Sequence, residues 1–382
     1  MKVGFFSPLP PSPTGVADYS AALLAALRNL GEVAVDDPRA DIALYHLGNN
    51  HLHREIYQQA LAHPGVVVIH DAVLQHFFLG TLDQTRYVDE FVYNYGEWTR
   101  GLAEDLWKNR ARSAADPRYF AYPMLKRIVT ASRAVIVHNP AAARVVRQHH
   151  DQARVFEIPH LFVPPPVPDH VETLRFRERL GLGPRTLLVG VFGHLRESKR
   201  LSAILRAMET VWKRGADATL LVQGEFASSD LARALAPRLT NDPRILRTGY
   251  LPDAEFWRWA SATDVCLNLR FPSAAETSGI AVAMMGIGKA VVFTAGEEIA
   301  RIPEDACLRV EASATEEKEL GDYLVWLAGD REAAIEIGRR AAVHIASEHA
   351  VEKVAAQYWE ALVFACSHDP KCCDEEQRGQ RN

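Results

Sequence analysis

Residues that could bind a sugar phosphate are concentrated directly after the apolar run 264–269. The next ten residues supply a cation, a carboxylate and the beginning of a helical stretch: Arg270, Glu276, Thr277, Ser278 and Gly279. A carboxylate accepts hydrogen bonds from sugar hydroxyls, and the free N–H groups at the start of a helix bind phosphate. Because Ser and Thr also cap helices without any ligand, the stretch indicates either a sugar-phosphate site or a capped helix.

A second group of polar residues follows the apolar run 187–192. It combines a glycine with a histidine and three cations: Gly193, His194, Arg196, Lys199 and Arg200. A turn of this kind that opens a helix can bind a diphosphate through its cations and its free amides. A cluster of charges is also typical of a solvated turn, so both interpretations stay open.

Two features of the amino-terminal half could contribute to the same chemistry. The apolar run 66–69 ends in His70 and Asp71. A histidine at the end of a buried strand can hydrogen-bond a sugar hydroxyl or exchange a proton near neutral pH, unless neighbouring backbone satisfies it. The loop 7–15 carries Gly15 just before a helical stretch, where backbone amides can approach an anion. Gly15 alone is a weak signal, because many turns between a strand and a helix carry a glycine.

The elements that must position these residues alternate between short apolar runs and longer helical patterns. Strands are expected at 3–6, 42–45, 66–69, 135–137, 187–192, 219–222, 245–248, 264–269 and 290–293. Almost uninterrupted apolar runs fit strands that are buried on both faces of a parallel sheet. Five prolines within 158–168 indicate a stiff linker. The sequence thus predicts two doubly wound α/β domains, with ligands at the carboxyl ends of the strands and in the cleft between the domains.

Composition excludes several other classes. The chain has 382 residues, is 48% hydrophobic and carries a formal net charge of −5. No run of about 18 uncharged apolar residues is present, so no membrane span is expected. The amino terminus does not resemble a secretory signal, and the five cysteines lack the spacing of a disulfide framework or a zinc site. The slightly acidic balance gives no reason to expect nucleic-acid binding. We therefore expect a cytoplasmic enzyme.

Residues 72–131 stand apart because they are rich in aromatic side chains. One interpretation is a helical insertion whose aromatic residues pack into a small core of their own. The other is a surface that binds an acceptor or touches a membrane. The sequence leaves both open.

Taken in order, these motifs resemble those of glycosyltransferase family 4, a retaining family with the two-domain GT-B fold and nucleotide-sugar donors. The resemblance extends from residue 2 to about residue 365. The motifs that carry it are Ser7–Pro11, Gly15–Ser20, Ile158–His160, Gly193–Lys199, Gly249–Leu251, Glu276–Gly279 and Gly288-Lys289.

The resemblance implies a role for each matching residue. Gly15 lies in the loop whose backbone contacts the donor's phosphates and sugar, and His70 is the histidine near the transferred sugar. Lys199 holds the diphosphate, and Glu276 contacts the donor-sugar hydroxyls. The implied catalytic residues are therefore His70, Lys199 and Glu276. The implied donor-binding residues are Gly15, Gly193, His194, Arg196, Arg200, Arg270, Thr277, Ser278 and Gly279.

The chain departs from the family pattern at two places. The basic residue that usually follows the glycine of the second turn is His194 here, so Arg196 or Arg200 is expected to supply the second cation. Counting back from Gly288 places Ala283 where the family has the glutamate that binds the nucleotide's ribose. The first glutamate is also offset by one residue. The ribose ligand is therefore unassigned.

The expected activity is transfer of a sugar from a nucleoside diphosphate, UDP or GDP, to an acceptor hydroxyl, with retained anomeric configuration and no metal or other cofactor. The acceptor is a polysaccharide or other carbohydrate, a lipid-linked glycan or a small molecule, and peripheral contact with the inner face of a membrane stays open. A non-catalytic scaffold with a degenerate GT-B fold is the first alternative. A sugar-nucleotide epimerase or a phosphorylase is the second.

The resemblance also implies a division of the chain. Residues 1–165 form the acceptor domain, with the insertion at about 72–131, and residues 170–347 form the donor domain. A final helix at about 348–366 packs back on the first domain, and residues 367–382 form a flexible tail.

Overall fold

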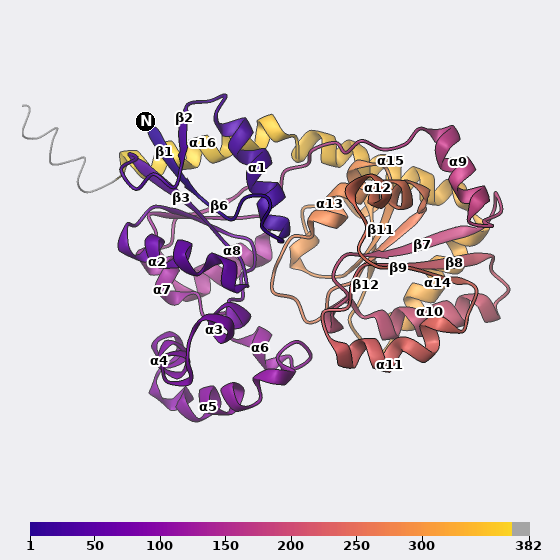
Figure 1. Ribbon diagram of the computed structural model, residues 1–382, viewed down its shortest axis with the longest axis horizontal. Helices are drawn as coiled ribbons and strands as arrows, with labels where there is room; N and C mark the ends of the chain where they lie inside the picture. The colour runs from indigo at the N-terminus through magenta and orange to yellow at the C-terminus, as the bar shows by residue number, and fades with distance from the viewer. Residues whose placement is uncertain (369–382) are drawn as a thin grey trace, which may run out of the picture. The chain divides into compact units, whose positions relative to one another are not determined.

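The computed structural model describes residues 1–368. Its first sheet has six parallel strands in the order β2-β1-β3-β4-β5-β6. Figure 1 labels β1, β2, β3 and β6 of this sheet. The strands are β1 (Lys2–Phe6), β2 (Glu32–Val35), β3 (Ile42–Leu47), β4 (Val66–Ile69), β5 (Ala134–Val137) and β6 (Val155–Glu157). Every residue of β4 and β5 is buried, as expected for central strands that helices cover on both faces.

Helices cover both faces of this sheet. The helices of this unit are α1 (Gly15–Leu27), α2 (Arg54–Ala62), α3 (Gln75–Thr81), α4 (Gln84–Tyr95), α5 (Arg100–Lys108), α6 (Arg118–Ala121), α7 (Lys126–Ala131), α8 (Pro140–His149) and α16 (Val351–Ser367). Of these, α4, α5 and α6 lie in the insertion, away from the strands (Figure 1). α1 and α16 share one core with the sheet, in which Tyr358 and Leu362 contact the face that carries Val3 and Leu44. Helix α16 therefore belongs to the same layer as α1.

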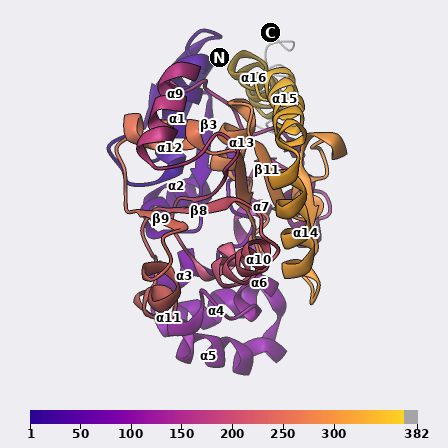
Figure 2. The same cartoon turned by 90° about the vertical axis from the view of Figure 1, so that its right-hand side faces the viewer.

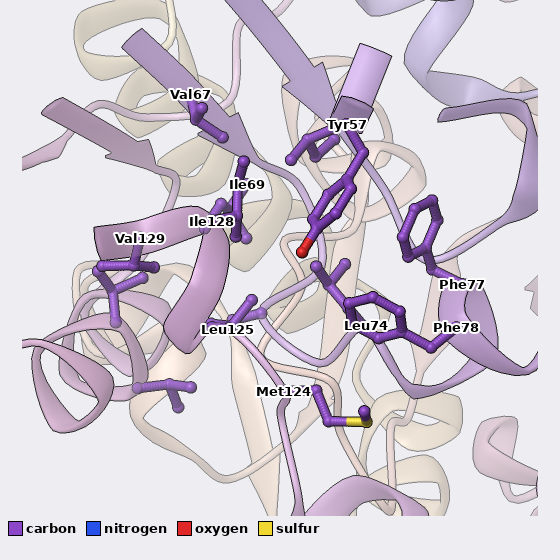
Figure 3. Packing of buried hydrophobic residues seen from close by; sticks show 14 of the residues in the cluster. Tyr57, Val67, Ile69, Leu74, Phe77, Phe78, Met124, Leu125, Ile128 and Val129 are labelled. Atoms are coloured by element: carbon purple, nitrogen blue, oxygen red, sulfur yellow. The ribbon is translucent and has the colours of Figure 1, made fainter. Parts of the chain in front are cut away.

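The aromatic insertion extends the core on the other face of the sheet. Phe77 and Phe78 of α3 lie against Tyr57, near Val67 and Ile69 of β4 (Figure 3). The same cluster continues into α4–α7 and includes Tyr87, Phe91 and Tyr119. Of the eleven aromatic residues at 72–131, five are therefore buried core residues and four more pack against this core. They extend the core of the sheet and do not form a separate one, whereas Trp98 is 81% exposed.

The second sheet is also built from six parallel strands, in the order β12-β11-β10-β7-β8-β9. These are β7 (Leu187–Phe192), β8 (Ala218–Gln223), β9 (Ile245–Thr248), β10 (Val265–Asn268), β11 (Ala290–Thr294) and β12 (Leu308–Val310). β7 and β8 are buried along their whole length. The prediction of two doubly wound parallel sheets is confirmed.

The second sheet has a hydrophobic core on each of its two faces. α10 (Leu201–Lys213), α11 (Ser229–Thr240) and α14 (Glu316–Gly329) pack on one face, where α10 and α14 lie side by side (Figure 2). The other face is covered by α9 (His170–Arg179), α12 (Asp253–Ala262), α13 (Gly279–Gly286) and α15 (Arg331–Glu348).

The described chain divides into two compact units. The first contains residues 1–161, 274–277 and those from 348 onward, and the second contains 162–273 and 278–347. The sequence-based division placed 274–277 in the second domain. The structure groups this segment with the first unit because Ala72 N–H donates to the Ala274 carbonyl at 2.9 Å. The tail expected at 367–382 lies outside the described residues, apart from Ser367, which ends α16, and His368.

No helix within residues 1–368 is both long enough and apolar enough to cross a membrane.

Candidate active site

A row of four histidines crosses the carboxyl edge of the first sheet. Four neighbouring strands supply one each: His46 lies in β3, His70 follows β4, His138 follows β5, and His160 follows β6. Because the strands are parallel, their carboxyl ends meet at one edge and bring these side chains together. Tyr19 of α1 lies against all four rings, at centroid distances of 4.6 to 6.1 Å.

Hydrogen bonds link three of the rings and define which nitrogens carry protons. His138 Nδ1 lies 3.0 Å from the Ile158 carbonyl, which can only accept, so Nδ1 carries a proton. Neutral His138 then accepts at Nε2 from His70 Nδ1–H, at 3.2 Å. Neutral His70 accepts at Nε2 from His46 Nδ1–H, at 3.0 Å. This assignment follows from the hydrogen-bond pattern. It leaves His46 Nε2 as a buried lone pair without a partner among residues 1–368.

The row is kept neutral. Burial is the main reason why the pKa of His46 and that of His70 lie well below the ordinary histidine value, and neighbouring histidines lower both further. Burial also lowers the pKa of His138 to about 4 and that of His160 to about 3. The Tyr19 hydroxyl pairs with that of Tyr358 at 2.8 Å. At physiological pH this edge is therefore polar and carries no charge on its histidines.

His70, predicted to lie near the transferred sugar, has both ring nitrogens engaged by other histidines. A sugar hydroxyl could bind either nitrogen only by displacing a ring. Within residues 1–368 no group of three or more His, Cys, Asp or Glu side chains is arranged to hold a metal ion. The geometry is that of a hydrogen-bonded histidine network.

Glu276 lies in the segment 274–277, which the first unit holds tightly. The Asn139 side-chain amide donates to the Ala275 carbonyl at 3.0 Å and to Thr277 Oγ1 at 2.9 Å. Ala275 has a φ of +54°, a left-handed conformation that costs an L-residue about 1 kcal/mol or more. Glu276 Oε2 accepts from Ala274 N–H at 2.8 Å. The carboxylate is therefore placed by a strained segment next to the carboxyl ends of β4 and β5.

Gly15 is the first residue of α1 and is exposed. A Cβ added there would meet no atom within 4 Å among the described residues. Thr14 caps the helix by accepting from Val16 N–H at 3.4 Å. Packing within the folded chain thus does not require glycine at position 15.

In the second unit, the turn after β7 places Lys199 against the end of its own strand. Lys199 is 6% exposed, and its Nζ donates to the Phe192 carbonyl. Gly193 has a φ of +83°, and a Cβ on it would lie 2.7 Å from Ile280 Cδ1 and 3.8 Å from Lys199 Nζ. The turn, Lys199 and the first residues of α13 are therefore immediate neighbours, and glycine is required where they meet.

The other polar residues of this turn differ in how they are engaged. Arg200 donates from Nε to both oxygens of the Glu316 carboxylate and from Nη2 to one of them, and Glu316 is 1% exposed. Arg196 is exposed and forms no ion pair within the described part of the chain. Desolvation lowers the pKa of His194, and nearby Arg196 and Lys199 lower it further. Of the two arginines considered as a second cation, Arg196 is the one that is not held in a buried ion pair.

Some of the residues around α13 have a structural role, and others are exposed to solvent. Ser278 caps the helix by accepting from Ala281 N–H at 3.3 Å, and its hydroxyl donates to Asn268 Oδ1 at 3.0 Å. Gly279 begins the helix and is exposed, and Arg270 follows β10, the strand next to β7. Ser278 therefore has the capping role considered for it. The first N–H groups of α13 have no partner within the helix itself.

Sequence reasoning missed His46, His138 and Asn139. The predicted strand 42–45 stopped one residue before His46, and no local pattern marks a histidine as part of a row. Asn139 precedes Pro140, and Asn followed by Pro is a typical start of a helix. That signal identifies the cap, because Asn139 Oδ1 accepts from Ala142 N–H. It does not reveal that the amide also reaches residues 275 and 277.

Several solved structures resemble this chain over nearly its full length. HepE from Anabaena, solved in complex with UDP, matches with a TM-score of 0.62 and 16% identity over 95% of this chain and 100% of that one. A second HepE structure contains UDP-glucose. Sucrose-phosphate synthase from Thermosynechococcus elongatus gives a TM-score of 0.65 at 15% identity, over 97% of this chain and 100% of that one.

WaaG, a glycosyltransferase involved in lipopolysaccharide biosynthesis, gives a TM-score of 0.55 at 14% identity, over 92% of this chain and 98% of that one. No protein-family model matches the sequence, and no curated protein sequence matches it. The likeness shows the fold, which is that of the GT-B glycosyltransferases.

Proposed function

We propose that this chain, with its GT-B fold, is a retaining glycosyltransferase of family 4 that uses a nucleoside-diphosphate sugar. The observation that carries the proposal is the buried Lys199, which lies beside Gly193 and the beginning of α13 at the carboxyl edge of the second sheet. A buried cation next to free helix amides is a site for a compact anion with more than one negative charge. The diphosphate of a sugar nucleotide is such an anion.

The reaction develops negative charge on the departing diphosphate. Lys199 and the amides at the beginning of α13 stabilise that charge more strongly in the transition state than in the bound substrate, which lowers the barrier. The exposed Arg196 supplies a second cation to the same group. No step requires a protein nucleophile, because the acceptor hydroxyl attacks from the face that the diphosphate leaves.

The neutral histidine row is compatible with the positive charge that develops at the sugar in the transition state. Glycosyl transfer passes through an oxocarbenium-like state, in which positive charge develops at the sugar. A protonated imidazole beside that charge would oppose the reaction. His70 is kept neutral by burial and by its neighbours His46 and His138, so it contributes polarity without that repulsion. Glu276 holds the donor-sugar hydroxyls.

The acceptor is a carbohydrate, a lipid-linked glycan or a small molecule, in keeping with polysaccharide biosynthesis. The donor is a UDP or GDP sugar, and the protein acts in the cytoplasm. Ala283 and His194 are the observations that favour a non-catalytic nucleotide-sugar-binding scaffold as the second candidate.

Two measurements separate the candidates. Thermal unfolding is followed with UDP, GDP and ADP, and release of each diphosphate is measured from the matching sugar nucleotides. Stabilisation together with release supports the enzyme, and stabilisation without release supports the scaffold. If none of the nucleotides stabilises the protein, the proposal is wrong.

A further inference from the structure

The family resemblance left the ribose ligand unassigned, and the second unit contains a carboxylate suited to that role. Ala283 stands where a carboxylate is expected, and an alanine side chain cannot accept a hydrogen bond. We propose that Glu225 accepts hydrogen bonds from the ribose hydroxyls of the nucleoside diphosphate. This inference rests on the proposed function, because it identifies the nucleoside end of the same donor site.

The place of Glu225 in the topology is the first argument. β8 lies between β7 and β9 in the sheet, and Glu225 follows β8 by two residues. In nucleotide-binding sheets a glycine turn after one strand holds the phosphates, and an acidic residue in the neighbouring βα unit binds the ribose. Here the order is β7, the turn at Gly193, α10, β8 and then Glu225, so the carboxylate occupies the corresponding position.

The backbone ties Glu225 directly to the phosphate-binding turn. Leu195 N–H donates to the Glu225 carbonyl at 2.8 Å, and Ala227 N–H donates to the Leu195 carbonyl at 3.0 Å. Gly224 has a φ of +126°, and a Cβ on it would lie 2.2 Å from the Gly193 carbonyl oxygen. The two loops are thus in backbone contact, and Glu225 is held within a nucleotide's reach of the turn that carries Lys199.

The side chain of Glu225 is also positioned from the other side. Its Oε1 accepts from Tyr250 N–H at 3.1 Å, in the loop that follows β9. A Cβ on Gly249 would lie 2.7 Å from that same oxygen, so the close approach depends on glycine. Glu225 is exposed, and the Tyr250 side chain beside it is 76% exposed. Tyr250 N–H thus holds one carboxylate oxygen in place, and the exposed carboxylate can still accept a hydrogen bond from a hydroxyl.

The test removes the Glu225 carboxylate from the protein and a ribose hydroxyl from the nucleotide, separately and together. Binding is measured by calorimetry for whichever of UDP, GDP and ADP binds most tightly, and for its 2′-deoxy and 3′-deoxy forms. The wild-type protein is compared with Glu225→Ala. Glu332→Ala is the control, because Glu332 is also exposed but follows Arg331, which pairs with Asp264 at the opposite, amino-terminal edge of the sheet.

We expect the wild type to bind at least one deoxy form about 10-fold or more weakly, the usual effect of a hydrogen bond to a charged group. Glu225→Ala should weaken the ribonucleotide by a similar factor and abolish the discrimination, whereas Glu332→Ala should keep it. If a folded Glu225→Ala protein still discriminates, or if the wild type never does, the assignment of Glu225 is wrong while the proposed function stands. If the wild type binds no nucleoside diphosphate, the proposed function fails as well.

Discussion

Asn139 is the side chain whose replacement best tests how the Glu276 segment is held. It is 3% exposed and makes three hydrogen bonds with its side-chain amide. The Oδ1 atom caps α8, and the Nδ2 atom donates to the Ala275 carbonyl and to Thr277 Oγ1. Asn139→Asp keeps the capping oxygen and removes both donors, whereas Asn139→Ala removes all three bonds.

The magnitudes follow from the number of bonds lost. A helix cap contributes about 1 kcal/mol, and each neutral hydrogen bond contributes about 1 kcal/mol. Asn139→Ala should therefore lower the free energy of unfolding by about 3 kcal/mol. Asn139→Asp should lower it by at least about 2 kcal/mol, because a buried carboxylate oxygen then faces the Ala275 carbonyl oxygen. Thr277→Val removes one bond and should cost about 1 kcal/mol, while Thr277→Ser keeps the oxygen and serves as its control. The strained Ala275 is then less firmly held, so the position of Glu276 becomes less well defined.

The assay combines urea unfolding with donor turnover for the four variants. If the segment must be held for Glu276 to act, kcat/KM should fall by up to about 30-fold in Asn139→Asp, the kinetic equivalent of about 2 kcal/mol. Thr277→Ser should be nearly unaffected. Full turnover in a folded Asn139→Asp protein would refute the claim that the hydrogen bonds donated by Asn139 position Glu276. A Thr277→Val protein as stable as the wild type would refute the bond count.

Four further predictions concern single residues. Lys199→Met keeps the aliphatic stem without the charge and should reduce donor turnover by about 100-fold or more; near-normal kinetics in a folded variant would contradict its role. Glu276→Ala should reduce turnover more than affinity for the free nucleotide, and equal losses in kinetics and calorimetry would exclude a sugar-facing role. Gly15→Ala should leave the melting temperature unchanged, because the new methyl group meets no described atom, but should lower kcat/KM about 10-fold if the donor contacts this loop; unchanged kinetics would remove Gly15 from the site. His53 is fully buried, and burial lowers its pKa to about 4. As pH falls below about 6.5 the unfolded chain takes up this proton first, so the free energy of unfolding should fall by up to about 1.4 kcal/mol per pH unit until about pH 4. His53→Asn should lessen that slope in urea titrations at pH 7, 6 and 5, and an unchanged slope would show that His53 is not responsible.

The strands that carry the site were predictable because burial on both faces leaves a continuous apolar run. β4 and β9 have the predicted bounds, and the helix 279–286 is also as expected. β2, β6 and β12 were not predicted, and β12, with one buried residue, is an outer strand of the second sheet. β2 and β6 are the outer strands of the first sheet. None of the three strands includes a run of buried residues, so the apolar signal that marks central strands is absent from them.

The candidate site was predictable only where its residues lie close together in the sequence. Gly193 and Lys199 are six residues apart, and one turn brings them together. The histidine row depends on strand order, since His46 and His138 meet His70 only because β3, β4 and β5 are neighbours in the sheet. Short-range spacing carries no information about that order.

Sugar transfer from a nucleoside diphosphate with retained configuration is the activity proposed for this chain. It is tested most directly by proton NMR of the first sugar released from UDP-glucose, GDP-mannose and ADP-glucose, before the anomers equilibrate, with water or a simple alcohol as acceptor. At least one donor should give a product with the donor's own anomeric configuration, and Lys199→Met should give none. An inverted product, or no turnover of any sugar nucleotide by the folded protein, would contradict the proposed activity.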